Sequence, residues 1–404
     1  MLLVSANRLI ITLTAFVASG RKFIPDLLNW DIFKQAAYTS LTRYDAGWYA
    51  QIAQSGYLNG KSSAFFPLFP LLMKTLSTLS GFTLKICGQG ISIICFIIAL
   101  WLVQILTGED GVLRFNENKQ KAGRWIACII AFNPVSFYYT ICYTESLFLM
   151  LTLLFMIAVG RNKWFIAGVT GFFAGITRNS GVFLAIIFFL EYIRSVLPDC
   201  GDSRPGKCLM HYFRSFFNFI RKFKLSYFQM HRSFLNIFLI PMGTIAYFSY
   251  LFYRFGSLSS ALSAVDQFGR SSMAPWMTLY HGIQYNIEKI STTDKPYIFN
   301  YFLLELIAVA VFIFAVFYLI RRVPLSYNLF MTASLILPLC KPAYLGLVDY
   351  FASFPRYAVT LFPYFIAIYG IFHGSRKAFI FYLAASIYML IRCVSFWSIG
   401  KFIA

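Results

Sequence analysis

Two charged side chains stand in an aromatic stretch near the start of the chain, "TRYDAGWYAQIAQSGY" (residues 42–57). Arg43 and Asp45 lie two positions apart there, in a chain that is short of acidic residues. A carboxylate in this setting has the chemistry of a general base, which removes a proton from a hydroxyl group. A structural alternative is open: Asp45 falls where it would cap a helix that begins at about Ala46. In that helix Trp48 and Tyr49 share a face, which predicts an amphipathic helix at a membrane surface and a contact with substrate.

A second acid and two further cations lie in short motifs elsewhere. Glu145 follows "NPVSFYYTICYT", Arg178 and Asn179 lie in "GITRNSG", and Arg356 lies in "FPRY". The planar guanidinium group of arginine suits the oxygens of a phosphate. We therefore expect Arg178 and Arg356 to bind a phosphate, with Glu145 as a second candidate acid. The structural alternatives are a helix cap for Glu145 and a snorkelling side chain for Arg178.

Further candidates carry weaker signals. Arg43 and His281 are additional candidates for phosphate binding, and Asn179 for substrate binding. No metal is required by these residues, although Asp45 with Glu145 is a possible divalent-metal pair. Cys200 and Cys208 bracket a polar stretch and leave a metal site or a disulfide open as an alternative. The chain has no CxxC pair and no cluster of histidines.

The amino-acid composition indicates the environment, aqueous or membrane, in which these candidate residues lie. Of the residues, 59% are hydrophobic and 20% aromatic, and only 12% are charged, against about 25% in a soluble domain. The formal net charge is +20. In a soluble protein this charge would indicate nucleic-acid binding, but here basic loops facing the cytoplasm and anionic lipid explain it. The sequence therefore predicts an all-α integral membrane protein with a single polytopic domain over residues 1–404.

Apolar runs predict about eleven transmembrane helices, several of them shorter than the roughly 20 residues that cross a bilayer. Their predicted ranges are 2–19, 84–107, 124–142, 146–160, 164–177, 181–196, 233–253, 300–320, 325–341, 351–372 and 378–397. Lysine and arginine are concentrated in alternate loops, and this bias places those loops in the cytoplasm. Loop 197–232 is the most basic of them. Loops 20–83 and 254–299 then face the opposite side, where the candidate residues also gather.

Four blocks in order resemble those of one enzyme family. "TRYDAGWYAQIAQSGY", "AFFPLFPLL", "NPVSFYYTICYTESLF" and "GITRNSG" are similar to blocks of the PIG-V-type mannosyltransferases, and "FPRY" continues the likeness weakly. These enzymes belong to the GT-C class of multi-spanning glycosyltransferases. The resemblance covers about residues 40–182. It implies a GT-C-like fold whose first extracytoplasmic loop contains amphipathic helices and carries the catalytic acid.

By this resemblance the chain is a glycosyltransferase without a required cofactor. Its donor would be polyprenyl- or dolichyl-phosphate mannose, and its acceptor a lipid or glycolipid like the precursors of glycosylphosphatidylinositol anchors. Asp45 would be the base, and the reaction would invert the anomeric carbon. The chain is shorter than the eukaryotic members and has no N-x-S/T acceptor site. A bacterial or archaeal plasma membrane is therefore favoured over the endoplasmic reticulum.

Two other classes of function remain open. A transporter or lipid flippase would also have many spans and basic inner loops. It would, however, be expected to hold its polar groups near the middle of the bilayer rather than on one face. A non-catalytic subunit of a glycosylation complex is the third alternative.

Overall fold

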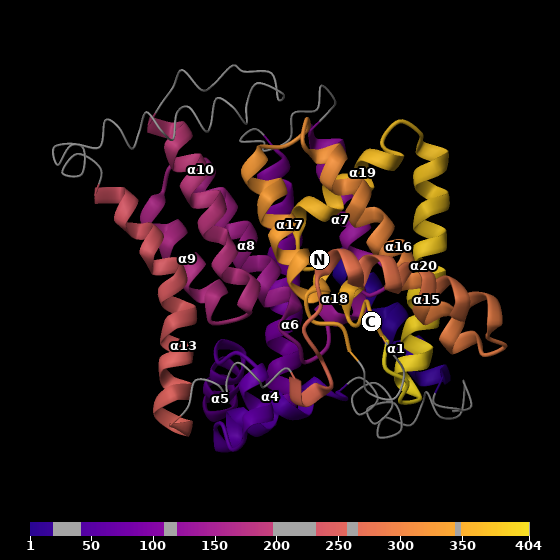
Figure 1. Cartoon of the computed structure of the whole chain (residues 1–404), viewed down its shortest axis with the longest axis horizontal. Helices are drawn as coiled ribbons and strands as arrows, with labels where there is room; N and C mark the ends of the chain where they lie inside the picture. Colours follow the sequence, from indigo (N-terminus) through magenta and orange to yellow (C-terminus); the bar gives the residue numbers. More distant parts are fainter. Residues whose placement is uncertain (19–41, 109–118, 197–231, 257–265, 344–348, 404) are drawn as a thin grey trace.

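The computed structural model describes residues 1–18, 42–108, 119–196, 232–256, 266–343 and 349–403. These residues fold into helices joined by short turns (Figure 1). Within these ranges there are two isolated β-bridges outside the helices, which pair Arg270 with Ala343 and Ala343 with Asp349. The described part of the chain is therefore all-helical, as its composition predicts.

Within the described residues, five helices are long and apolar enough to cross a membrane. The longest have 24 residues and are about 36 Å long, which exceeds the roughly 30 Å of a bilayer core. The five are α6 (Leu84–Thr107), η3 with α10 (Asn179–Phe183 and Leu184–Val196), η5 with α13 (Arg232–Phe238 and Leu239–Phe255), α16 (Pro296–Leu319) and α20 (Arg376–Ser398). These helices are compatible with a membrane protein.

Five further apolar helices have 10–17 residues. They are α1 (Leu2–Ala18), α8 (Glu145–Gly160), α9 (Trp164–Gly175), α17 (Leu325–Leu339) and α19 (Phe362–Phe372). They pack among the longer helices, with α8 between α6 and α9. Because several are shorter than a bilayer requires, the total of about eleven spans remains a prediction.

Two of the predicted spans are interrupted, which corrects their description as continuous helices. In the range 124–142, α7 (Lys119–Ala131) ends before Pro134, and a short 3-10 turn, η2 (Ser136–Tyr139), follows. Proline lacks the N–H that a helix needs, and it disfavours helical backbone at the residue before it. In the range 351–372, α18 (Phe354–Ala358) is separated from α19 by a break at Thr360 and Leu361. Thr360 and Leu361 are buried, as are Asn133 and Val135 on either side of Pro134. Irregular backbone is tolerated at membrane depth where protein covers it.

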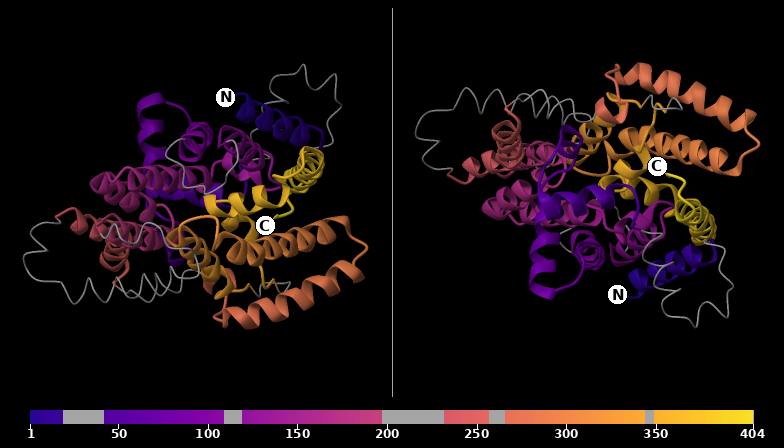
Figure 2. Two further views of the ribbon diagram at one scale, coloured as in Figure 1. Left: turned by 90° about the horizontal axis from the view of Figure 1, so that it is seen from above. Right: turned by 90° about the horizontal axis from the view of Figure 1, so that it is seen from below.

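The described part of the first predicted outer loop contains α4 (Asp45–Ser55), η1 (Gly60–Ala64) and α5 (Leu68–Ser80). These elements gather at one end of α6, in indigo and violet in Figure 1. In the second predicted outer loop, η6 (Asp266–Phe268) is followed by α15 (Pro275–Thr292), which lies beside α16 (Figure 2). The basic loop 197–232 falls, except for Arg232, outside the described residues.

Candidate active site

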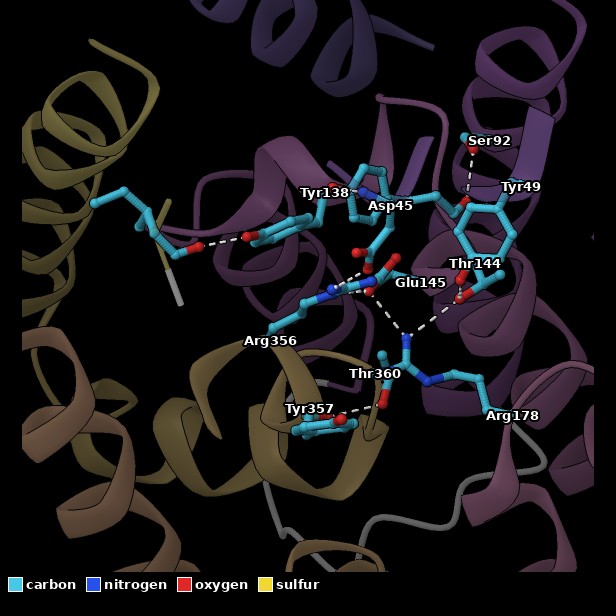
Figure 3. Close-up of polar contacts among 12 residues, drawn as sticks. Asp45, Tyr49, Ser92, Tyr138, Thr144, Glu145, Arg178, Arg356, Tyr357 and Thr360 are labelled. Atoms are coloured by element: carbon cyan, nitrogen blue, oxygen red, sulfur yellow. Dashed lines mark hydrogen bonds and ion pairs between the residues drawn. The ribbon is translucent and has the colours of Figure 1, made fainter. Parts of the chain in front are cut away.

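Four charged side chains meet where the ends of several elements converge (Figure 3). Asp45 is the first residue of α4 and Glu145 the first residue of α8. Arg178 immediately precedes η3, and Arg356 lies in the short helix α18. We call these four residues the charged cluster. Its members are separated by up to 311 positions along the chain, so the tertiary fold alone brings them together.

Glu145 is the buried centre of the charged cluster, with a fully buried side chain. Its Oε1 accepts a hydrogen bond of 2.9 Å from Nη1 of Arg178 and a second, short one from Nε of Arg356. Its Oε2 is buried and has no hydrogen-bond partner among the described residues. A buried carboxylate is costly unless cations and donors surround it. The two arginines therefore account for the presence of an acid here.

Asp45 is the more open of the two acids. Its side chain is 22% exposed, and its Oδ2 accepts a 2.6 Å hydrogen bond from Nη1 of Arg356. Helix α4 begins at Asp45 itself, and the residue before it makes no side-chain capping bond. The described hydrogen bond of this carboxylate is with Arg356 rather than with backbone amides. Helix capping therefore does not explain why residue 45 is acidic.

The backbone close to two members of the charged cluster, Asp45 and Arg356, adopts conformations that are uncommon for residues other than glycine. Tyr44, next to Asp45, has φ 52°, and Ser353, three residues before Arg356, has φ 64°. Non-glycine residues at positive φ cost about 1–3 kcal/mol each and persist only where their surroundings fix them. The Tyr143 hydroxyl contributes to this, because it donates to the Arg43 carbonyl and accepts from the Asp45 amide, each at 3.1 Å.

Tyrosines surround the two arginines, and sequence reasoning assigned them no role. The guanidinium of Arg356 lies 5.1 Å from the ring centre of Tyr138 and 4.6 Å from that of Tyr143. The guanidinium of Arg178 lies 5.3 Å from the ring of Tyr357. Burial raises the pKa of the Tyr143 phenol well above its ordinary value of 10.0, so this hydroxyl is neutral and keeps its proton. The aromatic run before Glu145 and the tyrosine after Arg356 were the available signals.

The remaining predicted site residues are distributed unevenly around the charged cluster. The Tyr49 hydroxyl is buried 3.4 Å from Oγ1 of Thr144, which itself contacts Arg178. The ring of Trp48 stacks on Phe65. Nη2 of Arg43 donates to the Ser398 carbonyl at 2.9 Å, so this arginine faces the C-terminal segment rather than the acids.

The side chains of His281 and Asn179 take no part in the charged cluster. His281 is on α15, where its ring stacks with Tyr350. Asn179 follows Arg178 but its side chain is exposed. Among the described residues, neither side chain forms a hydrogen bond or an ion pair with the four charged residues.

The electrostatics of the charged cluster are balanced, with two carboxylates and two guanidinium groups. Arg178 and Arg356 are therefore not free cations, and a phosphate that binds them has to share them with the acids. In the described part of the chain, no group of three or more His, Cys, Asp or Glu residues is arranged to hold a metal ion. Arg356 lies between Asp45 and Glu145 and bonds to both. Cys200 and Cys208 fall outside the described residues.

Comparison with known proteins returned no match to any protein-family model and no matching curated protein.

Proposed function

We propose that the protein is a membrane glycosyltransferase that moves a sugar, mannose by the resemblance of its sequence blocks, from a polyprenyl- or dolichyl-phosphate donor to a lipid-linked acceptor. The observation that carries the proposal is the charged cluster. It combines a partly open carboxylate, Asp45, with two arginines anchored by a buried acid, Glu145. A base and a pair of phosphate-directed cations are the groups that this transfer requires.

In the proposed reaction, the acceptor hydroxyl gives its proton to Asp45 as its oxygen attacks the anomeric carbon of the donor sugar. The new carbon–oxygen bond forms as the bond to the lipid phosphate breaks, and the electron pair leaves with the phosphate. Arg356 holds the Asp45 carboxylate in place through their 2.6 Å hydrogen bond. Attack opposite the leaving group inverts the anomeric carbon. A well-placed base of this kind accelerates transfer by about 10²–10⁴-fold.

Arg178 and Arg356 have the second role in this proposal. Charge concentrates on the departing phosphate, and cations already held in position stabilise that charge without reorganising. Glu145 is the acid that holds both guanidinium groups, through its Oε1. We assign Glu145 a positioning role and Asp45 the role of the base.

A transporter or flippase is the second candidate, and one observation favours it. The irregular segment between α7 and α8 leads directly to Glu145, and the break after α18 follows Arg356 closely along the chain. Discontinuous helices often form the substrate sites of transporters. The two candidates differ in outcome, because a transferase makes a new glycosidic bond and a transporter returns its substrate unchanged.

The deciding experiment is an assay of the purified protein with radiolabelled polyprenyl-phosphate mannose and a lipid extract as the source of acceptor. We expect a labelled lipid product, and the Asp45→Asn variant should form it at least about 10²-fold more slowly, because an amide does not take up the proton. Asparagine still offers Arg356 an oxygen, so folding should be retained.

Asp266→Asn is the matched control for this assay. Its carboxylate is 45% exposed and pairs with Lys341 away from the charged cluster, so this variant should transfer normally. Near-normal transfer by Asp45→Asn would reject Asp45 as the base. Movement of the labelled lipid across the membrane of vesicles that contain the protein, without any new product, would favour the transporter.

A further inference from the structure

A cavity of about 500 Å³ opens at the surface where the end of α4, the helix α5 and the start of α6 come together. Figure 1 shows these three elements side by side at one end of the molecule. Six of the eight residues that line the cavity have polar side chains, and none of the eight is acidic. The six polar residues are Gln54, Lys74, Ser77, Thr78, Thr83 and Lys85.

The charge of this cavity is positive and unbalanced. Lys74 comes from α5 and Lys85 from the first turn of α6. In the parts of the chain that the structure describes, neither lysine forms an ion pair. Two lysines that line one cavity, with the Gln54 amide and no acid among the lining residues, are complementary to an anion with several oxygens, such as a phosphate.

The surroundings of the cavity indicate that this phosphate belongs to a lipid. The side chains of Leu79 and Phe82, next to the cavity, are 80% and 62% exposed. Helix α6 begins at Leu84 and is long and apolar enough to cross a membrane, so Lys85 marks the end of a candidate span. At that depth lipid headgroups meet the start of the acyl chains.

We propose that this cavity binds the phosphate headgroup of an anionic lipid, with its acyl chains lying along Leu79 and Phe82. The site is distinct from the charged cluster. Asp45 and Gln54 stand at opposite ends of α4, nine positions apart, so the cavity lies about 14 Å along that helix from Asp45. One phosphate cannot contact both places. The inference is independent of the proposed sugar transfer, because binding is measured without a donor.

The test is the thermal stability of the detergent-purified full chain, titrated with dioctanoyl phosphatidic acid. Dioctanoyl phosphatidylcholine is the zwitterionic control. Glycerol 3-phosphate supplies the same phosphate without acyl chains. We expect saturable stabilisation by the phosphatidic acid. Lys74→Ala and Lys85→Ala should each raise its apparent Kd about fivefold, and the double variant about 25-fold, since each lysine near an anionic lipid contributes roughly 1 kcal/mol, about fivefold in Kd.

Lys61→Ala is the matched control, because Lys61 is an exposed lysine of η1 that does not line the cavity. This variant should keep the wild-type Kd. If Lys85→Ala does not fold, Lys85→Gln gives the same comparison while keeping the length of the side chain. Equal loss in Lys61→Ala, or no loss in the double variant, would overturn the cavity as the site. Equal binding of glycerol 3-phosphate would overturn its assignment to a lipid.

Discussion

At the level of single residues, Glu145 depends on two arginines that approach it from distant parts of the chain. Sequence reasoning could select Asp45, Glu145, Arg178 and Arg356 one by one, because each is a charge in an apolar setting where charge is costly. It could not pair them, since Glu145 and Arg356 are 211 positions apart and no local pattern encodes such a contact. Arg43 and His281 were also candidates, yet their side chains contact other partners.

Removal of one arginine should therefore be costly. Arg178→Ala leaves Glu145 buried with a single cationic partner, and loss of one partner from a buried pair costs about 3–5 kcal/mol. Arg178→Lys should recover only part of this, because an ammonium group lacks the planar fork of the guanidinium. Thermal unfolding in detergent measures both effects.

The matched control is the more exposed pair of Arg194 with Glu191, whose side chains are 34% and 13% exposed. Arg194→Ala should cost no more than about 1 kcal/mol. Adding Glu145→Gln to Arg178→Ala should restore stability, because it removes the poorly paired charge. If the double variant is as unstable as Arg178→Ala alone, the loss has another cause.

At the level of elements, the charged cluster is formed mainly at the ends of helices rather than along their central turns. Hydropathy predicted the apolar segments, but it could not separate a continuous span from a short helix followed by buried irregular backbone. The breaks at Pro134 and at Thr360 and Leu361 were missed for this reason. The signals were present as Asn133-Pro134 and Pro363, yet proline also occurs within continuous membrane helices. The breaks lie beside the positions of Glu145 and Arg356.

The packing of η3, which directly follows Arg178, should be disturbed by a single added methyl group. A Cβ at Gly181 would lie 2.4 Å from the carbonyl carbon and oxygen of Ala174. Gly181→Ala must therefore move η3 away from α9, and overpacking of this kind costs about 1–3 kcal/mol. We expect a lower unfolding temperature and, if the proposed function holds, slower transfer. Gly160→Ala is the control, because its Cβ would meet nothing within 4 Å; equal losses in both variants would contradict the packing argument.

The segment before α18 should make stability depend on pH. Burial raises the pKa of Asp349 above its ordinary value of 3.8, and its carboxyl accepts a hydrogen bond from the Tyr301 hydroxyl near Glu305 and Arg270. A carboxyl whose pKa is higher in the folded state stabilises the fold at low pH, and this contribution is lost as the pH rises from about 4 through the raised value. Asp349→Asn should flatten the decline in unfolding temperature over that range. An unchanged pH profile would show that Asp349 is not its source.

At the level of the whole molecule, composition was sufficient to predict an all-helical membrane protein, because the apolar fraction leaves few alternatives. The number of spans and their sidedness need more than composition. Several apolar helices are shorter than a bilayer, and whether they cross it depends on the neighbours that cover them.

Sidedness is open to a direct test with an impermeant thiol reagent on intact cells. After replacement of the native cysteines, Ser55→Cys at the exposed end of α4 should react, because the first loop is expected to face outward. Lys163→Cys should react only after permeabilisation. It lies in the exposed turn beyond the end of α8, a helix of 16 residues that begins at Glu145 and is about 24 Å long. The opposite labelling pattern would reverse the predicted topology.

The spacing of the charged cluster along the chain also sets an order of assembly during biosynthesis. Chains grow at about 5–20 residues per second. Arg178 is therefore made roughly 2–7 seconds after Glu145, which precedes it by 33 positions. Arg356 follows Glu145 by 211 positions, or roughly 11–42 seconds at the same rate. During that interval Glu145 and Arg178 have each other but not Arg356, and Asp45 has no partner from the cluster. The nascent chain therefore has an incomplete ionic core until Arg356 has been made.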